Sequence, residues 1–298
     1  MKEDGFVSQG YILILAASFF WGTSGTAQTF APEAATPFVI GAVRIGLGGL
    51  ALFLTAAVRG NLPDLHNWPL KLTCLAALSI AAYQLFFFSA VELTGVAVAT
   101  VVTMGSSPVL AGLLAWLVKK QKPVSSWYPA TLLAILGCIL LFLPEGETVV
   151  EPLGLLLSLG GGGVYALYAL ISKDLLEERS AETVMAVVGI IGGLILFPII
   201  IINRPDWLLE TRGLQVAAYL GVFSMALPYL LFNFGLILVP LASAMTLTLA
   251  EPLTAALLGI LLVGERLTIL NYLGLIFIML GISFLSFAGQ KATRNKQA

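Results

Sequence analysis

The chain has 298 residues, of which 59% are apolar and only 10% charged, and its mean hydropathy is +0.99. A soluble domain normally carries about a quarter charged residues, and a soluble fold this apolar would have no polar surface to present to water. The composition therefore excludes an ordinary water-soluble protein and predicts one that is surrounded by lipid. The net charge of −1 sums two membrane faces, so it says little about partners.

Ten apolar stretches are long enough to cross a bilayer, which takes about 20 residues of helix. The breaks between them are short and contain proline, glycine and charged residues. Mixed charge precedes the first stretch, so we expect it to remain as a transmembrane helix and not to be cleaved. The sequence thus predicts an all-α polytopic membrane protein with ten transmembrane helices. They are expected at about 9–30, 36–58, 68–93, 96–118, 125–143, 152–173, 181–202, 213–235, 240–262 and 269–288.

The third and fourth stretches are separated only by Leu93-Thr94-Gly95, which leaves almost no loop. These two helices are therefore expected to form a tight hairpin. The eighth and ninth stretches, which meet near Val239-Pro240, are expected to do the same.

The positive charges are distributed unevenly between the two faces. Ten spans place both termini on one side, and 11 of the 15 Lys and Arg residues fall on that side. Three fall on the opposite side, and Arg44 lies within a span. Cytoplasmic loops carry an excess of Lys and Arg, so we expect a multi-pass protein of the cytoplasmic (inner) membrane with both termini in the cytoplasm.

The first half of the chain matches the second at a constant offset of 144 residues without a gap. Each half, 1–144 and 145–298, then holds five helices, and the second ends in a short cytoplasmic tail. Because five is odd, the second half enters the membrane from the opposite face, which makes a 5+5 inverted repeat. The matching pairs include Gly10 with Gly154, Trp21 with Tyr165, Pro108 with Pro252, Tyr128 with Tyr272 and Gly137 with Gly281.

Several short motifs resemble those of a known family. They are Phe20-Trp21-Gly22, Arg44, Ser107-Pro108-Val109, Glu251-Pro252-Leu253, the segment from Leu262 through Gly264-Glu265-Arg266 to Leu267, and Gly274 with Gly281. In these motifs the chain resembles the drug/metabolite transporter superfamily, in particular its ten-helix, EamA-type exporter branch. The resemblance extends over residues 9–288. It implies a 5+5 inverted repeat, a central cavity, and export of amino acids or other small metabolites.

The first half departs from the pattern at one loop. Lys119-Lys120-Gln121-Lys122 stands where the second half has Gly264-Glu265-Arg266. The inverted topology accounts for this difference, because it places the first of these loops in the cytoplasm and the second outside.

Two ionisable side chains, Glu251 and Arg44, are expected in mid-span, where burying a charge costs a few kcal/mol or more. Glu251 is a candidate partner for a substrate ammonium group or a candidate proton carrier. The alternative is a structural carboxylate that pairs with Arg44 or caps free backbone groups. For Arg44 we favour a structural role, because Gly41 and Gly48 on the same face indicate tight helix packing around it.

Three prolines, Pro108, Pro228 and Pro252, also fall in mid-span. Each removes the hydrogen bond to the carbonyl four residues earlier, which in lipid must be satisfied by a neighbour, water or substrate. We treat the three as candidate hinges, and static kinks are the alternative. The carbonyls concerned are those of Met104, Ser224 and Thr248.

Polar and aromatic residues recur at helical spacing in several of the predicted spans. One such stripe is usually helix-packing contact, but stripes in matched helices of both halves predict a shared aqueous cavity with partly aromatic walls. The residues expected to line it are Trp21, Tyr83, Gln84, Thr103, Ser107, Tyr165, Tyr168, Tyr229, Asn233, Thr248 and Glu251.

Other classes of chemistry find little support. The only histidine, His66, lies in a loop, and no two acids lie close together within a span, so we expect no metal, no cofactor and no enzymatic activity. Cys74 and Cys138 lie inside apolar stretches and are interpreted as small packing residues.

The sequence therefore predicts a secondary transporter that moves small metabolites by alternating access around the cavity, and the resemblance implies that it works in the export direction. Amino acids, including hydrophobic and aromatic ones, are the expected substrates. The alternatives are a drug, nucleoside or polyamine carrier of the same fold, and then a channel or receptor. The expected partners are a small-molecule substrate and membrane lipid, with no nucleic acid. The oligomeric state stays open, and a monomer is compatible with the sequence.

Overall fold

The computed structural model describes residues 2–62, 64, 68–143, 151–264 and 266–295. His66 and Glu265 lie outside these residues. The described part of the chain is helical and contains no strand, in agreement with the expected all-α class. Its α-helices are α1 (Lys2–Thr29), α2 (Pro37–Val58), α3 (Leu70–Lys119), α4 (Trp127–Leu141), α5 (Pro152–Leu175), α6 (Ala181–Asn203), α7 (Thr211–Gly221), α8 (Leu227–Leu238), α9 (Leu241–Leu247), α10 (Glu251–Leu258) and α11 (Ile269–Asn295).

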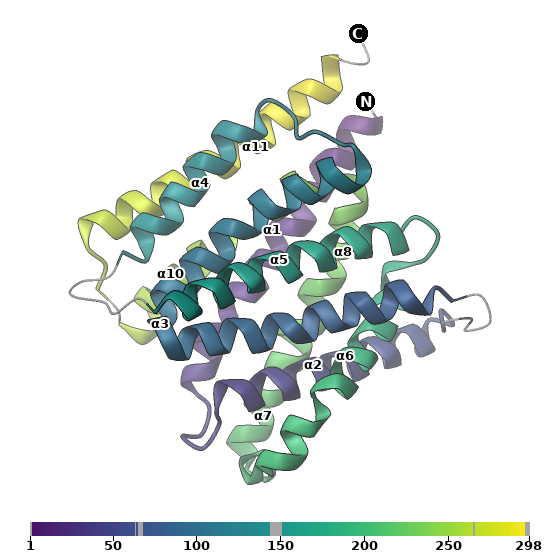
Figure 1. Cartoon of the computed structure of the whole chain (residues 1–298), viewed down its shortest axis with the longest axis vertical. Helices are drawn as coiled ribbons and strands as arrows, with labels where there is room; N and C mark the ends of the chain where they lie inside the picture. Colours follow the sequence, from purple (N-terminus) through teal and green to yellow (C-terminus); the bar gives the residue numbers. More distant parts are fainter. Residues whose placement is uncertain (1, 63, 65–67, 144–150, 265, 296–298) are drawn as a thin grey trace.

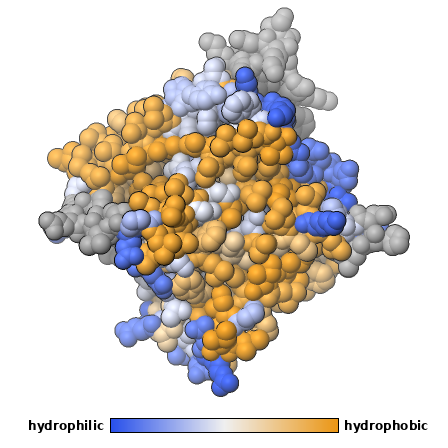
Figure 2. All heavy atoms as spheres, in the orientation of Figure 1, coloured by the Kyte–Doolittle hydropathy of each residue, from blue (hydrophilic) through white to orange (hydrophobic). Residues whose placement is uncertain are grey.

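Seven helical stretches in the described residues are long and apolar enough to cross a membrane. Two of them are composite. The first joins α7 to α8, and the second joins α9 to α10 and continues to Leu262. A further apolar helix, α4, is shorter. Figure 2 shows apolar residues over most of one face of the molecule, with hydrophilic residues towards its margins. The protein is therefore a multi-pass membrane protein.

Helix α3 contains one break in its backbone. A straight helix of 50 residues would be about 75 Å long, more than twice the thickness of the hydrocarbon core. At Gly95, however, the backbone has φ 78° and ψ 161°, a conformation that glycine adopts readily and other residues do not. The chain doubles back there (Figure 1), where the sequence predicted a tight hairpin. If α7 with α8 and α9 with α10 are each counted as one continuous unit, the described residues form nine helical units. The sequence predicted ten, and the difference arises because α3, residues 70–119, counts as a single unit.

The three mid-span prolines sit in different local structures. A π-helical turn, Val222–Ala226, leads into α8 just before Pro228, and a 3-10 turn, Thr248–Ala250, leads into α10 just before Pro252. Pro108 lies inside continuous α-helix. Prolines at matching positions of the two halves therefore do not produce the same backbone irregularity.

Each helix packs mainly against partners from the other half of the chain. α2 lies along α6, α4 lies along α11, α3 contacts α5, and α1 contacts α8 and α10. Figure 1 shows α4 beside α11 and both ends of the chain at one end of the molecule, which we call the terminus end. Glycine makes these approaches possible. At Gly137 in α4, an added Cβ would lie 2.6 Å from the backbone nitrogen of Ile278 in α11.

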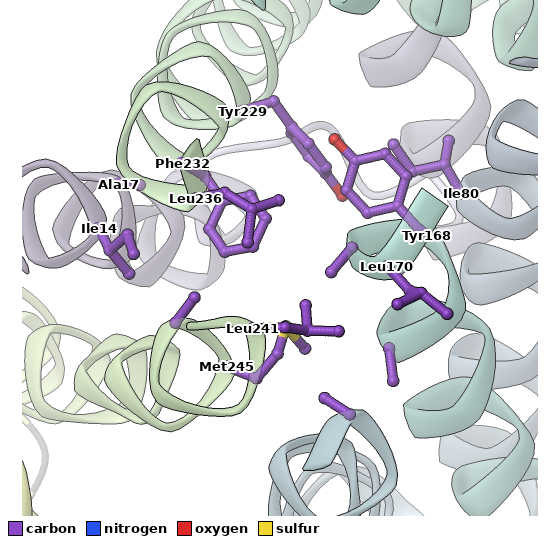
Figure 3. Packing of buried hydrophobic residues seen from close by; sticks show 14 of the residues in the cluster. Ile14, Ala17, Ile80, Tyr168, Leu170, Tyr229, Phe232, Leu236, Leu241 and Met245 are labelled. Carbon is purple, nitrogen blue, oxygen red and sulfur yellow. The ribbon is translucent and has the colours of Figure 1, made fainter. Parts of the chain in front are cut away.

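The terminus half of the molecule is filled by a solid apolar core. Side chains from α1, α3, α5, α8 and α9 converge there (Figure 3), and Tyr168 and Phe232 are among the largest that are fully buried.

Polar contacts tie the helix ends together at the terminus end. The Lys119 ammonium pairs with the Asp174 carboxylate at 2.6 Å, which joins α3 to α5. The neighbouring Lys173 Nζ donates to the carbonyls of Leu236, at 2.6 Å, and Val239, at the end of α8. The end of α5 is therefore held to both of its neighbours on this side. We call these contacts of Lys119, Lys173 and Asp174 the α5 latch.

Candidate functional site

A small cavity lies near the middle of the helix bundle. Its volume is about 40 Å³, enough for a few water molecules but not for a metabolite. We call it the inner cavity. Its lining comes from six helical segments, namely α1, α2, α3, α5, α8 and the composite α9–α10. The residues are Trp21, Ser24, Arg44, Tyr83, Thr103, Met104, Ser107, Tyr165, Tyr229, Thr248 and Glu251.

A larger cavity of about 340 Å³ adjoins the inner one. It shares Trp21, Ser24, Arg44, Tyr83, Met104 and Glu251 with the inner cavity. From there it extends past Phe88 and Thr100 to Gln28 at the end of α1, Pro37 at the start of α2, and Val96 beside the break in α3. These helix ends all lie away from the terminus end. We call this space the outer cavity.

Aromatic rings form one wall of the inner cavity, and two of them, Trp21 and Tyr83, also line the outer cavity. The Trp21 ring lies edge-on to Tyr229, with centroids 5.1 Å apart, and to Tyr165 at 6.3 Å. Tyr83 lies 5.4 Å from Tyr165. The hydroxyl groups of Tyr83, Tyr165 and Tyr229 bond to none of the described residues, so they are free to bind water or a solute in the cavity. The wall thus offers both apolar surface and hydrogen-bonding groups.

Arg44 and Glu251 line the same cavity but do not form a direct ion pair in the described structure. The two side chains interact electrostatically, without a direct contact between their charged groups. Arg44 Nε is buried and has no hydrogen-bond partner among the described residues. An arginine and a carboxyl group that face one cavity without a direct partner can each pair with a group of opposite charge on a ligand.

The close packing expected around Arg44 is present. At Gly41 an added Cβ would lie 2.9 Å from Phe88, and at Gly48 it would lie 2.8 Å from the Gly221 carbonyl. The arginine backbone is therefore held on a tightly packed face, while its side chain reaches the cavity. A direct ion pair with Arg44, which was one interpretation of Glu251, is not formed among the described residues.

The hydroxyl groups of the inner cavity are partly used within the protein. Ser107 Oγ donates to the Met104 carbonyl at 3.0 Å, which satisfies the group freed by Pro108. Thr103 Oγ1 donates to Ser158 at 3.1 Å, and Thr248 Oγ1 donates to Met245 at 2.7 Å. Their oxygens keep lone pairs that can accept hydrogen bonds from a ligand.

The Thr248 carbonyl, which Pro252 leaves without its usual helical partner, is also satisfied within the protein. Its oxygen accepts a hydrogen bond from the Glu251 amide. Gln84 lines the outer cavity only, and its Nε2 atom has no partner among the described residues. Pro252 lines the outer cavity as well.

Two residues expected on the cavity wall lie elsewhere. Tyr168 and Asn233 are completely buried in the core on the terminus side, where Asn233 Nδ2 donates to the Tyr168 hydroxyl at 2.9 Å and that hydroxyl donates to Met185 Sδ at 3.1 Å. Neither residue lines the inner or the outer cavity, because both lie further along α5 and α8 towards the terminus end. Helical spacing shows which face of a helix a residue lies on, but it does not show how far along the helix the cavity extends.

Met104 was not predicted as a lining residue, since nothing in its side chain marks it as polar or aromatic. One signal was nevertheless present. Met104 lies 144 residues before Thr248, and both residues line the inner cavity. Applying the repeat to each predicted residue would have found it.

Comparison with known proteins gives a consistent result. The EamA-like transporter family matches residues 8–143 and again 152–287. The uncharacterized transporter YwfM of Bacillus subtilis is 42% identical over 94% of this chain and 94% of its own length. The threonine/homoserine exporter RhtA of Salmonella typhimurium is 30% identical over 89% of this chain and 86% of its own length.

One solved structure, described as "Crystal structure of protein", superposes with a TM-score of 0.81 over 94% of this chain and 98% of that one. The sequence identity is 18%, so this likeness shows a shared fold. Together with the family match, it accounts for the apolar helices and the cavity between them. The chain belongs to the EamA-like transporter family and is a membrane transporter, not an enzyme.

Proposed function

We propose that the protein exports small amino acids across the cytoplasmic membrane by alternating access. The observation that carries this proposal is the unpaired Arg44 and Glu251 on one cavity. The carboxylate of an amino acid would pair with the arginine, and its ammonium group would pair with the glutamate. A polyamine would be repelled by Arg44. The RhtA relative, described as a threonine/homoserine exporter, supports the same substrate class.

The aromatic wall suits the remainder of such a substrate. Trp21, Tyr165 and Tyr229 present ring surface to an apolar side chain, and the free tyrosine hydroxyls can hydrogen-bond to a polar one. We therefore expect aliphatic, hydroxylated and aromatic amino acids to compete for the site.

We further propose that the chain makes ten spans. The two arms of α3, 70–94 and 96–119, would each be about 36 Å long, which is enough to cross the hydrocarbon core. Counting them separately raises nine continuous units to ten spans, five in each half. Both termini then lie in the cytoplasm, and the outer cavity opens to the outside. Excess positive charge at the terminus end, which includes Lys119, Lys173 and Arg179, supports this orientation.

An inverted repeat of two five-helix halves completes the proposal. Support comes from contacts that recur at the offset of 144 residues. An added Cβ at Gly137 would meet Gly274 and Ile278, and one at Gly281 would meet Ala130 and Ala134. Adding 144 to Ala130 and Ala134 gives Gly274 and Ile278, so each half makes the same contact with the other. The family also matches the chain as two consecutive segments of equal length.

Counterflow into proteoliposomes tests the proposed function. Vesicles loaded with unlabelled threonine should accumulate labelled threonine transiently, with saturation, and alanine, phenylalanine, a nucleoside and spermidine are tested as competitors. We expect the amino acids to compete and spermidine not to compete. Flux that neither saturates nor shows trans-stimulation would indicate a channel. Competition by the nucleoside or by spermidine, without competition by the amino acids, would show that the substrate belongs to that other class. Glu33→Gln, at an exposed site away from the cavity, is the control variant.

A further inference from the structure

An open groove of about 440 Å³ lies on the outer surface of the bundle, between the end of α3 and the start of α4, and belongs to neither cavity. Helix α3 contributes Val109, Gly112, Leu113 and Trp116, which are three or four residues apart and therefore lie on one face of the helix. The side chains of Val109, Leu113 and Trp116 are exposed. The groove extends along about 10 Å of this helix. We call it the α3–α4 groove.

The groove exists because α4 does not pack along the helix that precedes it. After the short loop 120–126, α4 lies along α11 instead. The floor of the groove is Trp127, whose Nε1 atom donates to the Ala242 carbonyl and to Thr246 Oγ1, both at 3.0 Å. At Gly112 an added Cβ would lie 3.0 Å from the indole ring of Trp127. The floor is thus fixed by hydrogen bonds and close packing, so the groove is a permanent feature of the fold.

The mouth of the groove contains aromatic residues of the kind found at membrane interfaces. It is formed by Trp116, Lys122 and Tyr128 together with the Trp127 ring, which lies 5.0 Å from the Tyr128 ring. Trp and Tyr are enriched at the depth of the lipid headgroups. Figure 1 shows that α3 ends and α4 begins at the terminus end. The mouth therefore lies where the hydrocarbon core meets the headgroups, and the apolar part of the groove lies deeper.

Positive charge without a protein partner lies at this mouth. Lys120 and Lys122 are exposed and form no ion pair among the described residues, whereas the neighbouring Lys119 is held in the α5 latch by Asp174. Helix α4 also begins here, and the N-terminal end of a helix carries partial positive charge. An apolar groove with a cationic mouth is complementary to an amphiphile with an apolar tail and a negative head.

The two halves of the chain differ at these positions. Lys120 has φ 58°, in the left-handed region that residues other than glycine rarely adopt. The residue 144 positions later is Gly264, with φ 80°, which is the residue that this conformation favours. Asn271 likewise stands in the second half where the first has Trp127. The first half therefore carries a lysine at a position where the backbone favours glycine, and the groove's aromatic floor is specific to this half.

From these observations we propose that the α3–α4 groove binds one anionic phospholipid. An acyl chain lies along Val109 and Leu113, and the phosphate group is held by the ammonium groups of Lys120 and Lys122. Basic pockets between transmembrane helices recognise anionic headgroups in this way. The long lysine side chains reach the headgroups while their methylene groups cover apolar surface. The site is separate from both cavities, so it does not depend on the proposed substrate.

Quenching of tryptophan fluorescence tests the site, because Trp116 and Trp127 line the groove. The purified full-length protein in detergent is titrated with phosphatidylglycerol or with phosphatidylcholine, each with brominated acyl chains, which quench tryptophan on contact. Phosphatidylglycerol should quench at a concentration about tenfold lower than phosphatidylcholine. Lys120→Gln/Lys122→Gln should abolish this preference. Arg266→Gln, an exposed position 144 residues after Lys122, is the matched control and should retain it.

Two further variants locate the acyl chain. Val109→Phe fills the apolar end of the groove without changing its charge, and it should weaken quenching by phosphatidylglycerol several-fold. Leu280→Phe, at an exposed position on α11, should have no effect. Trp116→Phe should lose much of the quenching by phosphatidylglycerol, since it removes an exposed reporter from the mouth. Inorganic phosphate at equal concentration should not displace the lipid, because it has no tail. Unchanged melting temperatures without added lipid check that the variants fold.

The same measurements can overturn the proposal. Equal quenching of the parent protein by both lipids, or a preference that survives in Lys120→Gln/Lys122→Gln, would contradict recognition of the headgroup by these lysines. Undiminished quenching of Trp116→Phe would place the lipid elsewhere. A dimer in native mass spectrometry that Trp116→Ala dissociates and phosphatidylglycerol does not would show that a second copy of the chain covers the groove. None of these measurements uses transport, so their outcome is independent of the proposed function.

Discussion

Trp21 of α1 and Tyr165 of α5 lie edge to face across the inner cavity, with ring centroids 6.3 Å apart. The two residues occupy the same position in the two halves of the chain, 144 residues apart. The centre of the bundle is therefore formed by equivalent aromatic residues from both halves. In the proposed mechanism these two rings contact the substrate in both states.

Replacement of Glu251 by Gln separates its two interpretations. Since Glu251 makes no direct pair with Arg44, the nearly isosteric Gln variant should fold normally and keep its melting temperature in detergent. Counterflow should fall by about tenfold or more, equivalent to about 1.4 kcal/mol of lost interaction. Glu33→Gln should transport like the parent protein.

The double variant Glu251→Gln/Arg44→Gln provides the cross-check. A large fall in the melting temperature of Glu251→Gln that the second substitution restores would mean that the glutamate neutralises Arg44 and is structural. An inactive single variant of unchanged melting temperature would exclude that role.

Tyr165→Phe tests whether the free hydroxyl contacts the substrate. The substitution keeps the ring contacts with Trp21 and Tyr83 and removes one polar group from the cavity. The KM for threonine should rise by about tenfold, and that for alanine should rise less, because alanine has no hydroxyl to bind. Tyr272→Phe, at an exposed position on α11, serves as control. Equal effects on both substrates would show that Tyr165 does not recognise the side chain.

Gly281→Ala tests the packing between α4 and α11. Its Cβ would lie 2.6 Å from the Ala130 carbonyl and 2.9 Å from the Ala134 nitrogen, which are backbone atoms that cannot rotate away. We expect a loss of about 1–3 kcal/mol of stability, seen as a lower melting temperature in detergent. At Gly46 nothing lies within 4 Å, so Gly46→Ala should be neutral or slightly stabilising. A stable Gly281→Ala variant would contradict the close contact.

The proposed orientation is tested with cysteines in exposed loops. In a background in which Cys74 and Cys138 are replaced by alanine, cysteines at Glu33 and Asp206 should react with an impermeant reagent on intact cells. Cysteines at Gln121 and Glu178 should react only after permeabilisation. All four positions are exposed in the structure. Labelling of Gln121 on intact cells would place the termini outside and reverse the assignment of the outer cavity.

Much of the fold can be predicted from the sequence, because a membrane helix needs a long apolar stretch and its loops need breaking residues. The hairpin at Leu93-Thr94-Gly95 is a clear example, since Gly95 supplies the positive φ angle that the reversal requires. The irregular turns before Pro228 and Pro252 were less predictable. Proline removes one hydrogen bond, but the backbone around it relaxes as its neighbours allow, and Pro108 shows that an α-helix can continue.

The cavity is harder to predict, because depth along the membrane and the state of the transporter do not follow from helical spacing. Tyr165 and Tyr168 lie one turn apart on α5, yet only Tyr165 reaches the inner cavity, and Tyr168 is buried in the core. Arg44 was expected to have a structural role from the glycines beside it. Those glycines do pack closely, but they fix only the backbone, and the long side chain extends beyond them into the cavity.

Recognition of a zwitterion by Arg44 and Glu251 is tested most directly with substrate analogues that lack one charge. Inhibition of threonine counterflow is measured for threonine, for threoninamide, which lacks the carboxylate, and for 3-hydroxybutyrate, which lacks the ammonium group. The parent protein should be inhibited far better by threonine than by either analogue. Arg44→Gln should lose the preference for threonine over threoninamide, and Glu251→Gln should lose the preference over 3-hydroxybutyrate. Preferences that stay unchanged in both variants, while transport persists, would contradict recognition of the substrate by these two charges.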